Sequence, residues 1–550
     1  MSIKIKNKTE EYNNSSETQE QTTQIKQKIA IKDRDLSPSD AEELQQINGK
    51  IEEIKRMYNN ELEKQSDDEM LLAQIYSKYE SSQELTREEL FFVYGIDPIT
   101  KLFINRKQQV SPRLTEMLKS RDIKGDIAKA IGCSIEEVSI TEEEALLGNI
   151  KYHYGDLYFH NLQSAVGLKL PESISGNISF DSLESARGLK LPENIGGNIY
   201  ISCLNSARGM RLPKIINGDL ALNGIQSVRG LKLPKSVKGK LYLNSLTSAK
   251  GLKLPKSVGS IILLNLKSAK GLKLPKNING NLHFGRLWSA KGLKLPEIIG
   301  GDLDLSNIES AEGLKLPKSV GRDLNLSNIE SAEGLKLPKS VGRDLRLSSL
   351  QSAEGLELPE SIGRGLYLSR LRSAKGLKLP ESIGGDLDLS RLRSAEGLKL
   401  PKSVGGGLYL SSLQSAEGLK LPESIGKDLY LHGLQSAEGL EFPESIGKNL
   451  YLHDLQSAEG LKLPKSVGGV LNLSSLQSAE VLKLPEKIGI ELILGIYNFK
   501  PTIDLKLAES DRGKFILCTS YNLKQEDIEE FRKRYPTLEM DSGLLYIDKR

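Results

Sequence analysis

The stretch GLKLPKSVGRDLNLSNIESAE, residues 313–333, decides the fold of this 550-residue chain. Leu314 and Leu316 alternate around one polar residue, and Leu324 and Leu326 do the same. Apolar alternation with a period of two is the signature of a half-buried β-strand. Glycine, proline and serine separate the two pairs and favour turns. Two short strands with their turns leave no room for a three-turn helix.

The same unit recurs along most of the chain. Its proline occurs sixteen times from Pro171 to Pro485, always 21 residues apart except for one step of 20 that ends at Pro275. The missing residue falls before Ser260, where we expect a turn. Because so short a unit cannot bury its apolar side alone, we expect a mainly β chain, a parallel β-solenoid of about sixteen 21-residue coils. Seven residues of one coil are expected to point inward: Leu314, Leu316, Val320, Leu324, Leu326, Ile329 and Ala332.

Two segments of the unit resemble a known family. The segment LKLPKSV at residues 335–341 looks like leucine-rich repeats of the bacterial surface-antigen type. The segment GDLDL at residues 385–389 is similar to the coil of receptor L-domains. The resemblance covers roughly residues 150 to 490. It implies a right-handed, leucine-rich-repeat-like solenoid that serves binding rather than chemistry.

The composition divides the chain into four segments. Residues 1–36 are polar and are expected to form a disordered tail. Residues 37–150 carry helical patterns, residues 151–490 hold the solenoid, and residues 491–550 combine strand and helix patterns. Because the ends of a solenoid expose unpaired strand edges, we expect both flanks to cap it.

Helix signals dominate the N-terminal region. Apolar residues from Leu44 to Leu62 recur at spacings of three and four, which indicates an amphipathic helix. This helix either packs into a local hairpin with residues 67–81 or self-associates as a coiled coil. Thr86 with Glu89 forms the sequence signature of a capping box at the start of a further helix.

Two other segments outside the repeat are informative. Residues 126–139 have the spacing of a DNA-binding helix-turn-helix, but the second helix would carry several glutamates, which phosphates repel. A structural helical turn is the favoured interpretation. Near the C-terminal end, residues 514–518 and 544–547 are expected strands, and residues 525–534 between them are an expected helix.

The sequence contains no motif for catalysis, cofactor binding or metal binding. His432 and His453 are 21 residues apart and should stack on adjacent coils, with Asp454 beside the second. A metal site normally needs three or four ligands, so a solvated histidine pair is expected instead. Because near-identical coils offer few unique residues to hold against one another, we expect no enzyme, no cofactor and no metal.

Three features bear on the compartment. Cys133, Cys203 and Cys518 are odd in number and far apart, as expected of a reducing environment. No apolar run follows the charges of the N-terminus, so no signal peptide is expected, and no stretch reaches the 18 apolar residues of a membrane span. We therefore expect a cytoplasmic protein, with secretion by a signal-less route left open.

The residue between the second pair of leucines varies and is tyrosine in seven coils. Exposed tyrosine and arginine are typical anchors of protein interfaces, although an aromatic ladder also stabilises a sheet by itself. Our first hypothesis is a non-enzymatic scaffold that binds another protein through the outer faces of the solenoid. The residues assigned to this interface are Tyr367, Tyr409, Tyr430, Tyr451, Trp288, Arg370, Arg372, Arg391 and Arg393.

The alternative function is binding of a polyanion. The net charge of the chain is only +4, yet residues 187–296 hold 20 basic and 2 acidic residues, a net charge of +18. Such a face attracts nucleic acid, an anionic surface or an acidic protein. Residues 1–150, with 21 basic and 29 acidic residues, could also fold back on it. The columns that form it are Arg187, Lys190, Arg208, Arg211, Lys214, Arg229, Lys232, Lys235, Lys250, Lys253, Lys256, Lys270, Lys273, Lys276, Lys291 and Lys294.

Overall fold

The computed structural model describes residues 67–104, 112–477 and 482–496, together with the backbone of residues 514–519, 538–541 and 544–548. The chain divides into two compact units, Met1–Leu90 and Phe91–Arg550. The described residues include no helix long and apolar enough to cross a membrane. Three expectations lie outside the described residues: the disordered tail, the amphipathic helix from Leu44 to Leu62, and the helix at residues 525–534.

The first unit contains a helix at residues 67–80 and the start of α4 (Arg87–Tyr94). The predicted capping box is confirmed. The backbone N–H of Thr86 donates to Glu89 Oε2 at 2.7 Å, and the N–H of Glu89 donates to Thr86 Oγ1 at 3.3 Å. These two bonds satisfy N–H groups that the first turn of a helix leaves without partners.

The second unit begins with short helices that lead into the first coil. The predicted helical turn is confirmed, since only a three-residue 3-10 turn, η1, follows α6 where a recognition helix would stand. Strand β1 then pairs with β2 of the first coil in parallel and covers its edge. The elements are α5 (Pro112–Lys119), α6 (Ile123–Ile131), η1 (Ile135–Glu137), β1 (Val138–Ser139), α7 (Glu142–Ala145) and β2 (Tyr152–His153).

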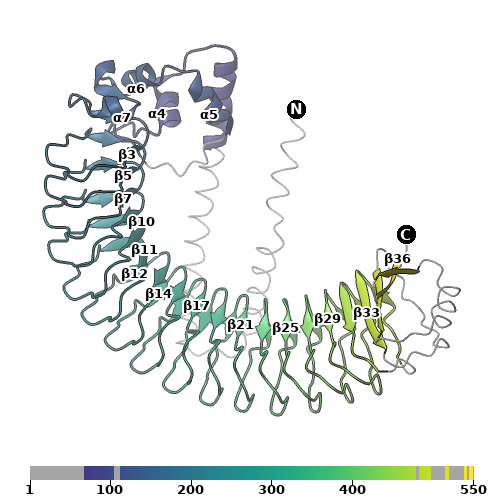
Figure 1. Ribbon diagram of the computed structural model, residues 1–550. Helices are drawn as coiled ribbons and strands as arrows, with labels where there is room; N and C mark the ends of the chain where they lie inside the picture. Colours follow the sequence, from purple (N-terminus) through teal and green to yellow (C-terminus); the bar gives the residue numbers. More distant parts are fainter. Residues whose placement is uncertain are drawn as a thin grey trace, which may run out of the picture. The chain divides into compact units, whose positions relative to one another are not determined.

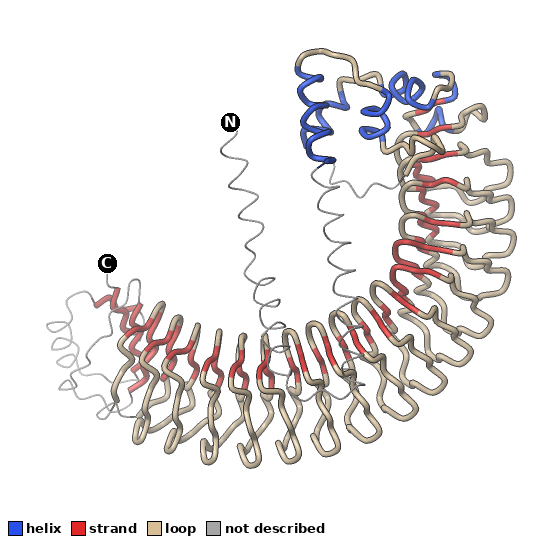
Figure 2. The backbone as a smooth tube through the Cα atoms, turned by 180° about the vertical axis from the view of Figure 1, so that it is seen from behind, coloured by secondary structure: helices blue, strands red, loops and turns tan. Residues whose placement is uncertain are grey.

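One strand from each coil enters a long parallel sheet (Figure 1), which follows the inner side of the curved row of coils (Figure 2). Residues 21 apart pair directly, as Leu324 does with Leu345. The strands are β3 (Leu157–Phe159), β5 (Ile178–Phe180), β7 (Ile199–Ile201), β9 (Leu220–Ala221), β10 (Ser236–Tyr242), β11 (Ser257–Ile262), β13 (Leu282–His283), β15 (Leu303–Asp304), β17 (Leu324–Asn325), β19 (Leu345–Arg346), β21 (Leu366–Tyr367), β23 (Leu387–Asp388), β25 (Leu408–Tyr409), β27 (Leu429–Tyr430), β29 (Leu450–Tyr451), β31 (Val470–Leu473) and β33 (Glu491–Ile496).

A second, shorter strand per coil builds further parallel pairs. These strands are β4 (Ser173–Ile174), β6 (Asn194–Ile195), β8 (Ile215–Ile216), β12 (Asn277–Ile278), β14 (Ile298–Ile299), β16 (Ser319–Val320), β18 (Ser340–Val341), β20 (Ser361–Ile362), β22 (Ser382–Ile383), β24 (Ser403–Val404), β26 (Ser424–Ile425), β28 (Ser445–Ile446), β30 (Ser466–Val467) and β32 (Lys487–Ile488). The two sets confirm a mainly β parallel solenoid of about sixteen 21-residue coils.

The position of this second strand corrects one expectation. The pair Leu314 and Leu316 was expected to be a strand, but the strand forms three residues later at Ser319–Val320. The N–H of Leu314 is already used, because it donates to Ala311 O within the same coil at 3.0 Å. Pro317, which follows the pair, has no N–H to give. The segment therefore has too few free donors for a continuous strand, and only isolated bridges form at this position in other coils, such as Lys190 with Arg211.

The expected inward residues form one continuous core. Leu324, Leu326 and Ile329 have no exposed surface, and Leu314, Val320 and Ala332 are at most 5% exposed. Leu316 is the exception, since it is only half-buried against the rim of the core. Removal of these side chains from water is the main stabilising contribution to the stack.

Two glycines per coil are fixed by geometry. Gly313 has a φ of +72°, and the same position has a φ between +71° and +89° in every coil from Gly167 to Gly460. This left-handed conformation favours glycine strongly. A Cβ on Gly321 would lie 2.2 Å from the carbonyl oxygen of Gly300 in the preceding coil, so a side chain there would push the two coils apart.

The coil with the missing residue shows a second difference from expectation. Residues 236–242 and 257–262 are continuous strands, β10 and β11, and their pairing shifts register between Val237 and Lys240. A bulge inside these strands, rather than a turn, absorbs the deletion. Val258 and Ile261 remain buried, so both alternations survive as expected.

Beyond the last coil the long sheet continues. Strand β34 (Lys514–Thr519) pairs in parallel with β33, and β36 (Leu544–Asp548) pairs with β34 in the antiparallel direction. Strand β35 (Leu538–Asp541) adds to β36. The two strands expected at the C-terminal end are therefore confirmed, and they cover the edge of the last coil.

Candidate interaction surface

Three tyrosines on adjacent coils stack on the long sheet. Tyr409, Tyr430 and Tyr451 end the strands β25, β27 and β29, and they occupy equivalent register positions. Their ring centroids lie 4.6 and 4.7 Å apart, with interplanar angles of 11° and 16°. All three side chains are half-buried. We call this set the tyrosine ladder; its rings are ordered by one another and keep part of their surface exposed.

Glycine makes room for two of the tyrosine rings. A Cβ on Gly407 would lie 3.0 Å from the ring of Tyr409, and a Cβ on Gly365 would lie 2.7 Å from the ring of Tyr367. Each glycine stands two residues before its tyrosine, where most other coils carry Asp or Asn. The ring therefore leans back over its own strand. The aspartate of the next coil, Asp428, lies close enough to act on the rings of both Tyr409 and Tyr430.

Three carboxylates lie beside the tyrosine ladder. Asp386 Oδ1 accepts from the N–H of Gly407 at 2.8 Å, Asp428 Oδ1 accepts from the N–H of Asn449 at 3.1 Å, and Asp388 accepts from neighbouring serines. No basic side chain among the described residues forms an ion pair with any of the three. Their negative charge therefore remains available at this surface.

The surroundings of two ladder tyrosines disfavour the loss of their phenolic protons. Burial, followed by the charge of Asp428, raises the pKa of Tyr430 to about 12. Burial, followed by Asp386 and Asp428, also raises the pKa of Tyr409. The hydroxyl groups of Tyr409 and Tyr430 therefore keep their protons and can donate hydrogen bonds to a partner.

His432 and His453 form a second stack next to the ladder. Their ring centroids lie 4.7 Å apart at 11°, and His432 meets the ring of Tyr430 edge-on at 6.3 Å. The stacking expected from the 21-residue spacing is confirmed. Both rings keep part of their surface exposed, but Nδ1 of each ring is buried without a hydrogen-bond partner. Burial, together with His453, lowers the pKa of His432.

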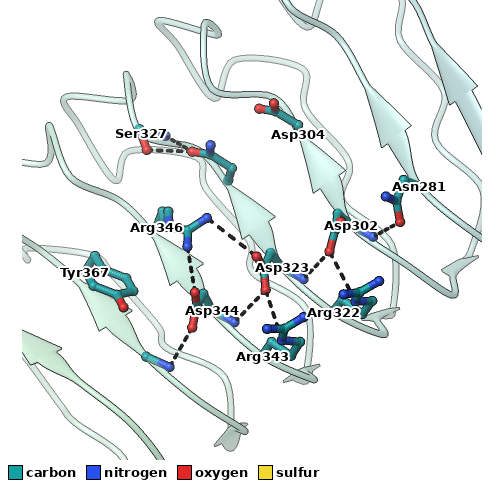
Figure 3. A network of polar contacts seen from close by, with 12 residues as sticks. Asn281, Asp302, Asp304, Arg322, Asp323, Ser327, Arg343, Asp344, Arg346 and Tyr367 are labelled. Carbon is teal, nitrogen blue, oxygen red and sulfur yellow. Dashed lines mark hydrogen bonds and ion pairs between the residues drawn. The ribbon is translucent and has the colours of Figure 1, made fainter. Parts of the chain in front are cut away.

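A row of Asp and Asn side chains runs along the coils that precede the ladder (Figure 3). Asn281 accepts from the N–H of Asp302 at 2.9 Å, Asp302 from that of Asp323 at 3.2 Å, and Asp323 from that of Asp344 at 3.2 Å. Arg346 Nη2 donates to Asp344 at 2.6 Å. This row was not predicted, although Asp or Asn recurs before the second leucine pair with the same 21-residue period.

The remaining residues assigned to the protein interface lie apart from the ladder. Tyr367 is separated from Tyr409 by Asp388, and the Arg346 guanidinium lies 5.4 Å from its ring centre. Trp288 is 59% exposed but precedes the ladder by more than five coils. The four arginines are exposed on the segments that follow strands β21 and β23, past the sheet: Arg370, Arg372, Arg391 and Arg393.

The basic columns form a separate surface, which we call the basic face. All sixteen side chains assigned to it, from Arg187 to Lys294, are exposed. No ion pair involves any of them within the described part of the chain. In later coils, by contrast, neighbouring charges pair along one column, as Lys318 does with Glu297 at 3.1 Å. The described residues hold no cluster of three or more potential ligands for a metal ion.

Comparison with known proteins gives no relative: no family model, no curated protein and no solved structure matches this chain.

The row of Asp and Asn side chains predicts a contrast between two substitutions. Asp323→Ala leaves the N–H of Asp344 without an acceptor and should lower the free energy of unfolding by about 1–3 kcal/mol. Asp323→Asn keeps the acceptor, as Asn281 does naturally, and should cost less. Urea denaturation of both variants measures the difference. Equal losses would show instead that the ion pairs with Arg343 and Arg346 dominate.

The histidine stack predicts a pH-dependent stability. Because the pKa of His432 is lowered in the folded chain, the unfolded chain takes up the proton first. The stability that uncharged His432 contributes to the folded chain is therefore present above the ordinary pKa of 6.5, and it is lost as the pH falls below that value. His432→Gln should reduce the fall in melting temperature between pH 7.5 and 5.5. Gln414→Ala, which alters an exposed residue that does not titrate, is the control and should leave that fall unchanged.

Proposed function

We propose that this chain is a non-enzymatic scaffold that binds another protein, with the tyrosine ladder at the centre of the interface. The observation that carries the proposal is the ordered stack of Tyr409, Tyr430 and Tyr451 beside three unpaired carboxylates. Near-identical coils favour binding over catalysis, because they present repeated surfaces instead of a single set of unique reactive groups.

Preordered rings lower the cost of binding. An interface gains most from aromatic anchors that bury further surface without losing side-chain freedom. The stacked neighbours already restrict Tyr430, and its protonated hydroxyl offers a hydrogen-bond donor. Tyrosines at the centre of an interface commonly contribute 2 kcal/mol or more each, on the order of thirtyfold in affinity.

The chemistry around the ladder defines the partner. Asp386, Asp388 and Asp428 lack cationic partners among the described residues, and tyrosine rings attract ammonium and guanidinium groups. A partner segment that presents lysine or arginine would satisfy both features. The arginines past the sheet would extend the interface to acidic groups of the same partner: Arg370, Arg372, Arg391 and Arg393.

A random peptide display library tests this function and requires no identified partner. The full chain should enrich peptides that contain lysine or arginine. Two variants should bind the enriched peptides at least tenfold more weakly than the wild type in a direct titration. One is Tyr430→Ala, and the other combines Asp386→Asn with Asp428→Asn. Tyr158→Ala, at the same position of the first coil, is the matched control and should bind as the wild type does.

Two outcomes would contradict the proposal. Enrichment without basic residues would overturn the chemistry assigned to the partner, and unchanged binding by Tyr430→Ala would remove the ladder from the interface. Loss of the ring stacking should itself cost about 1 kcal/mol of stability, so each variant is first compared by thermal unfolding. Tyr430→Phe keeps the stack and separates the role of the hydroxyl from that of the ring.

A further inference from the structure

The positive charges of the basic face lack neighbouring negative charges, whereas those of the later coils have them. Its three columns occupy the residue before the left-handed glycine, the residue between the first pair of leucines, and the residue after the proline. In the later coils the first of these positions is usually glutamate, as at Glu312, and the last is a mixture of lysine and glutamate. Within the described chain, only the later coils show ion pairs along such a column, Glu297 with Lys318 and Glu444 with Lys465.

The columns run straight from coil to coil because the coils are held in register. Ser206 bridges to Ser227 and Lys190 bridges to Arg211, each in parallel across one coil boundary. A Cβ on Gly230 would lie 3.1 Å from Cα of Arg208, so successive loops are in close contact where the first column lies. Successive positive charges are therefore repeated at a spacing of about 5 Å along the stack.

A row of positive side chains is destabilised by mutual repulsion unless negative charge binds along it. Two like charges 5 Å apart repel by about 0.8 kcal/mol in water before screening. Arg208, Arg211 and Lys214 stand in one coil, and each has an equivalent in the next coils, so the repulsion recurs at every step. A linear chain of phosphates laid along the columns would remove it at each coil. A folded acidic protein seldom offers carboxylates in so regular a line.

Trp288 adds a contact of a different kind to this face. It is the single tryptophan of the chain, and 59% of its surface is exposed. Arg286 and Lys291 flank it in sequence, and Lys267 occupies its position in the preceding coil. Its backbone is fixed, since its carbonyl accepts from the N–H of Glu309 at 3.3 Å. An exposed aromatic ring on a fixed backbone among cations can serve as a stacking platform for unpaired bases.

We propose that the basic face binds single-stranded nucleic acid, with the phosphate backbone along the three columns and a base against Trp288. The site is separate from the tyrosine ladder and does not depend on the proposed function. Binding should be independent of sequence, because cations and a single aromatic ring contact the backbone and the faces of bases rather than their edges.

Fluorescence anisotropy with a labelled 30-nucleotide oligo(dT) and oligo(rU) tests the electrostatic part. If about five phosphates are neutralised, the affinity of the full chain should fall about a hundredfold between 50 and 200 mM salt. The combined change Lys232→Glu, Lys253→Glu and Lys273→Glu should weaken binding more than tenfold at 50 mM salt. The matched control makes the same change in the same column of later coils: Lys315→Glu, Lys336→Glu and Lys399→Glu.

The control variant should bind within about twofold of the wild type, although its net charge changes by the same amount. Equal losses in both variants would overturn the proposal, because they would reflect total charge rather than the basic face. If either set of Lys→Glu changes unfolds the chain, Lys→Gln at the same positions allows the same comparison between the two variants, because it removes the positive charges without adding negative ones. Tyr430→Ala should leave oligonucleotide binding unchanged, which separates this site from the protein interface.

Trp288 reports on base contact directly, because all tryptophan fluorescence comes from it. Oligo(dT) should quench this fluorescence, whereas heparin, which has charge but no bases, should not. Trp288→Ala should weaken oligonucleotide binding about 5- to 100-fold and leave heparin binding unchanged. Equal effects on both polymers would overturn the assignment to nucleic acid. So would binding to phosphatidylserine vesicles in the absence of binding to either oligonucleotide.

Discussion

The in-register stacking of one 21-residue coil on the next is the constraint on which the rest of the structure depends. In the long sheet the N–H of Leu345 donates forward to Gly365 O at 2.8 Å. In the second set of strands the N–H of Gly342 donates back to Val320 O at 2.9 Å. Each coil is therefore hydrogen-bonded to both neighbours, and its leucines are buried only because those neighbours are present.

A constant register also decides the surface. Any residue type that recurs with the period becomes a column, so a favourable contact is repeated and so is an unfavourable one. Repetition of tyrosine is stabilising, since the rings stack at 4.6 Å, and repetition of aspartate is stabilising because Asp323 accepts an N–H of the next coil. Repetition of like charges is destabilising unless an opposite charge is near. Neither of the two proposed binding surfaces has an ion-pair partner for its charge among the described residues.

The sequence predicted the period, the number of coils and nearly all of the core, because apolar alternation and the spacing of prolines depend only on the repeat. The predicted position of the shorter strand was wrong by three residues, since Leu314 and Leu316 alternate as clearly as Leu324 and Leu326 do. Competition by Ala311 O for the N–H of Leu314 is invisible to periodicity.

The candidate site was predicted in part. Stacking of the tyrosines and of the two histidines followed from the spacing alone. The burial of Nδ1 in His432 and His453 did not, because it depends on how the neighbouring side chains pack. Grouping the tyrosines with Trp288 rested on residue type, which carries no information about distance along the stack. The row of Asp and Asn side chains was detectable at the same period, but its role required knowing which N–H groups faced it.

Oxidative cross-linking measures the register most directly. In a chain whose native cysteines are replaced by serine, Arg346→Cys with Tyr367→Cys places two thiols on directly paired residues, with Cα atoms about 5 Å apart and within reach of a disulfide. Arg346→Cys with Asp388→Cys places them two coils apart, at about 10 Å. Stacking in register predicts a disulfide in the first variant and none in the second, as read by mass spectrometry. A disulfide in the second variant, or in neither, would contradict it.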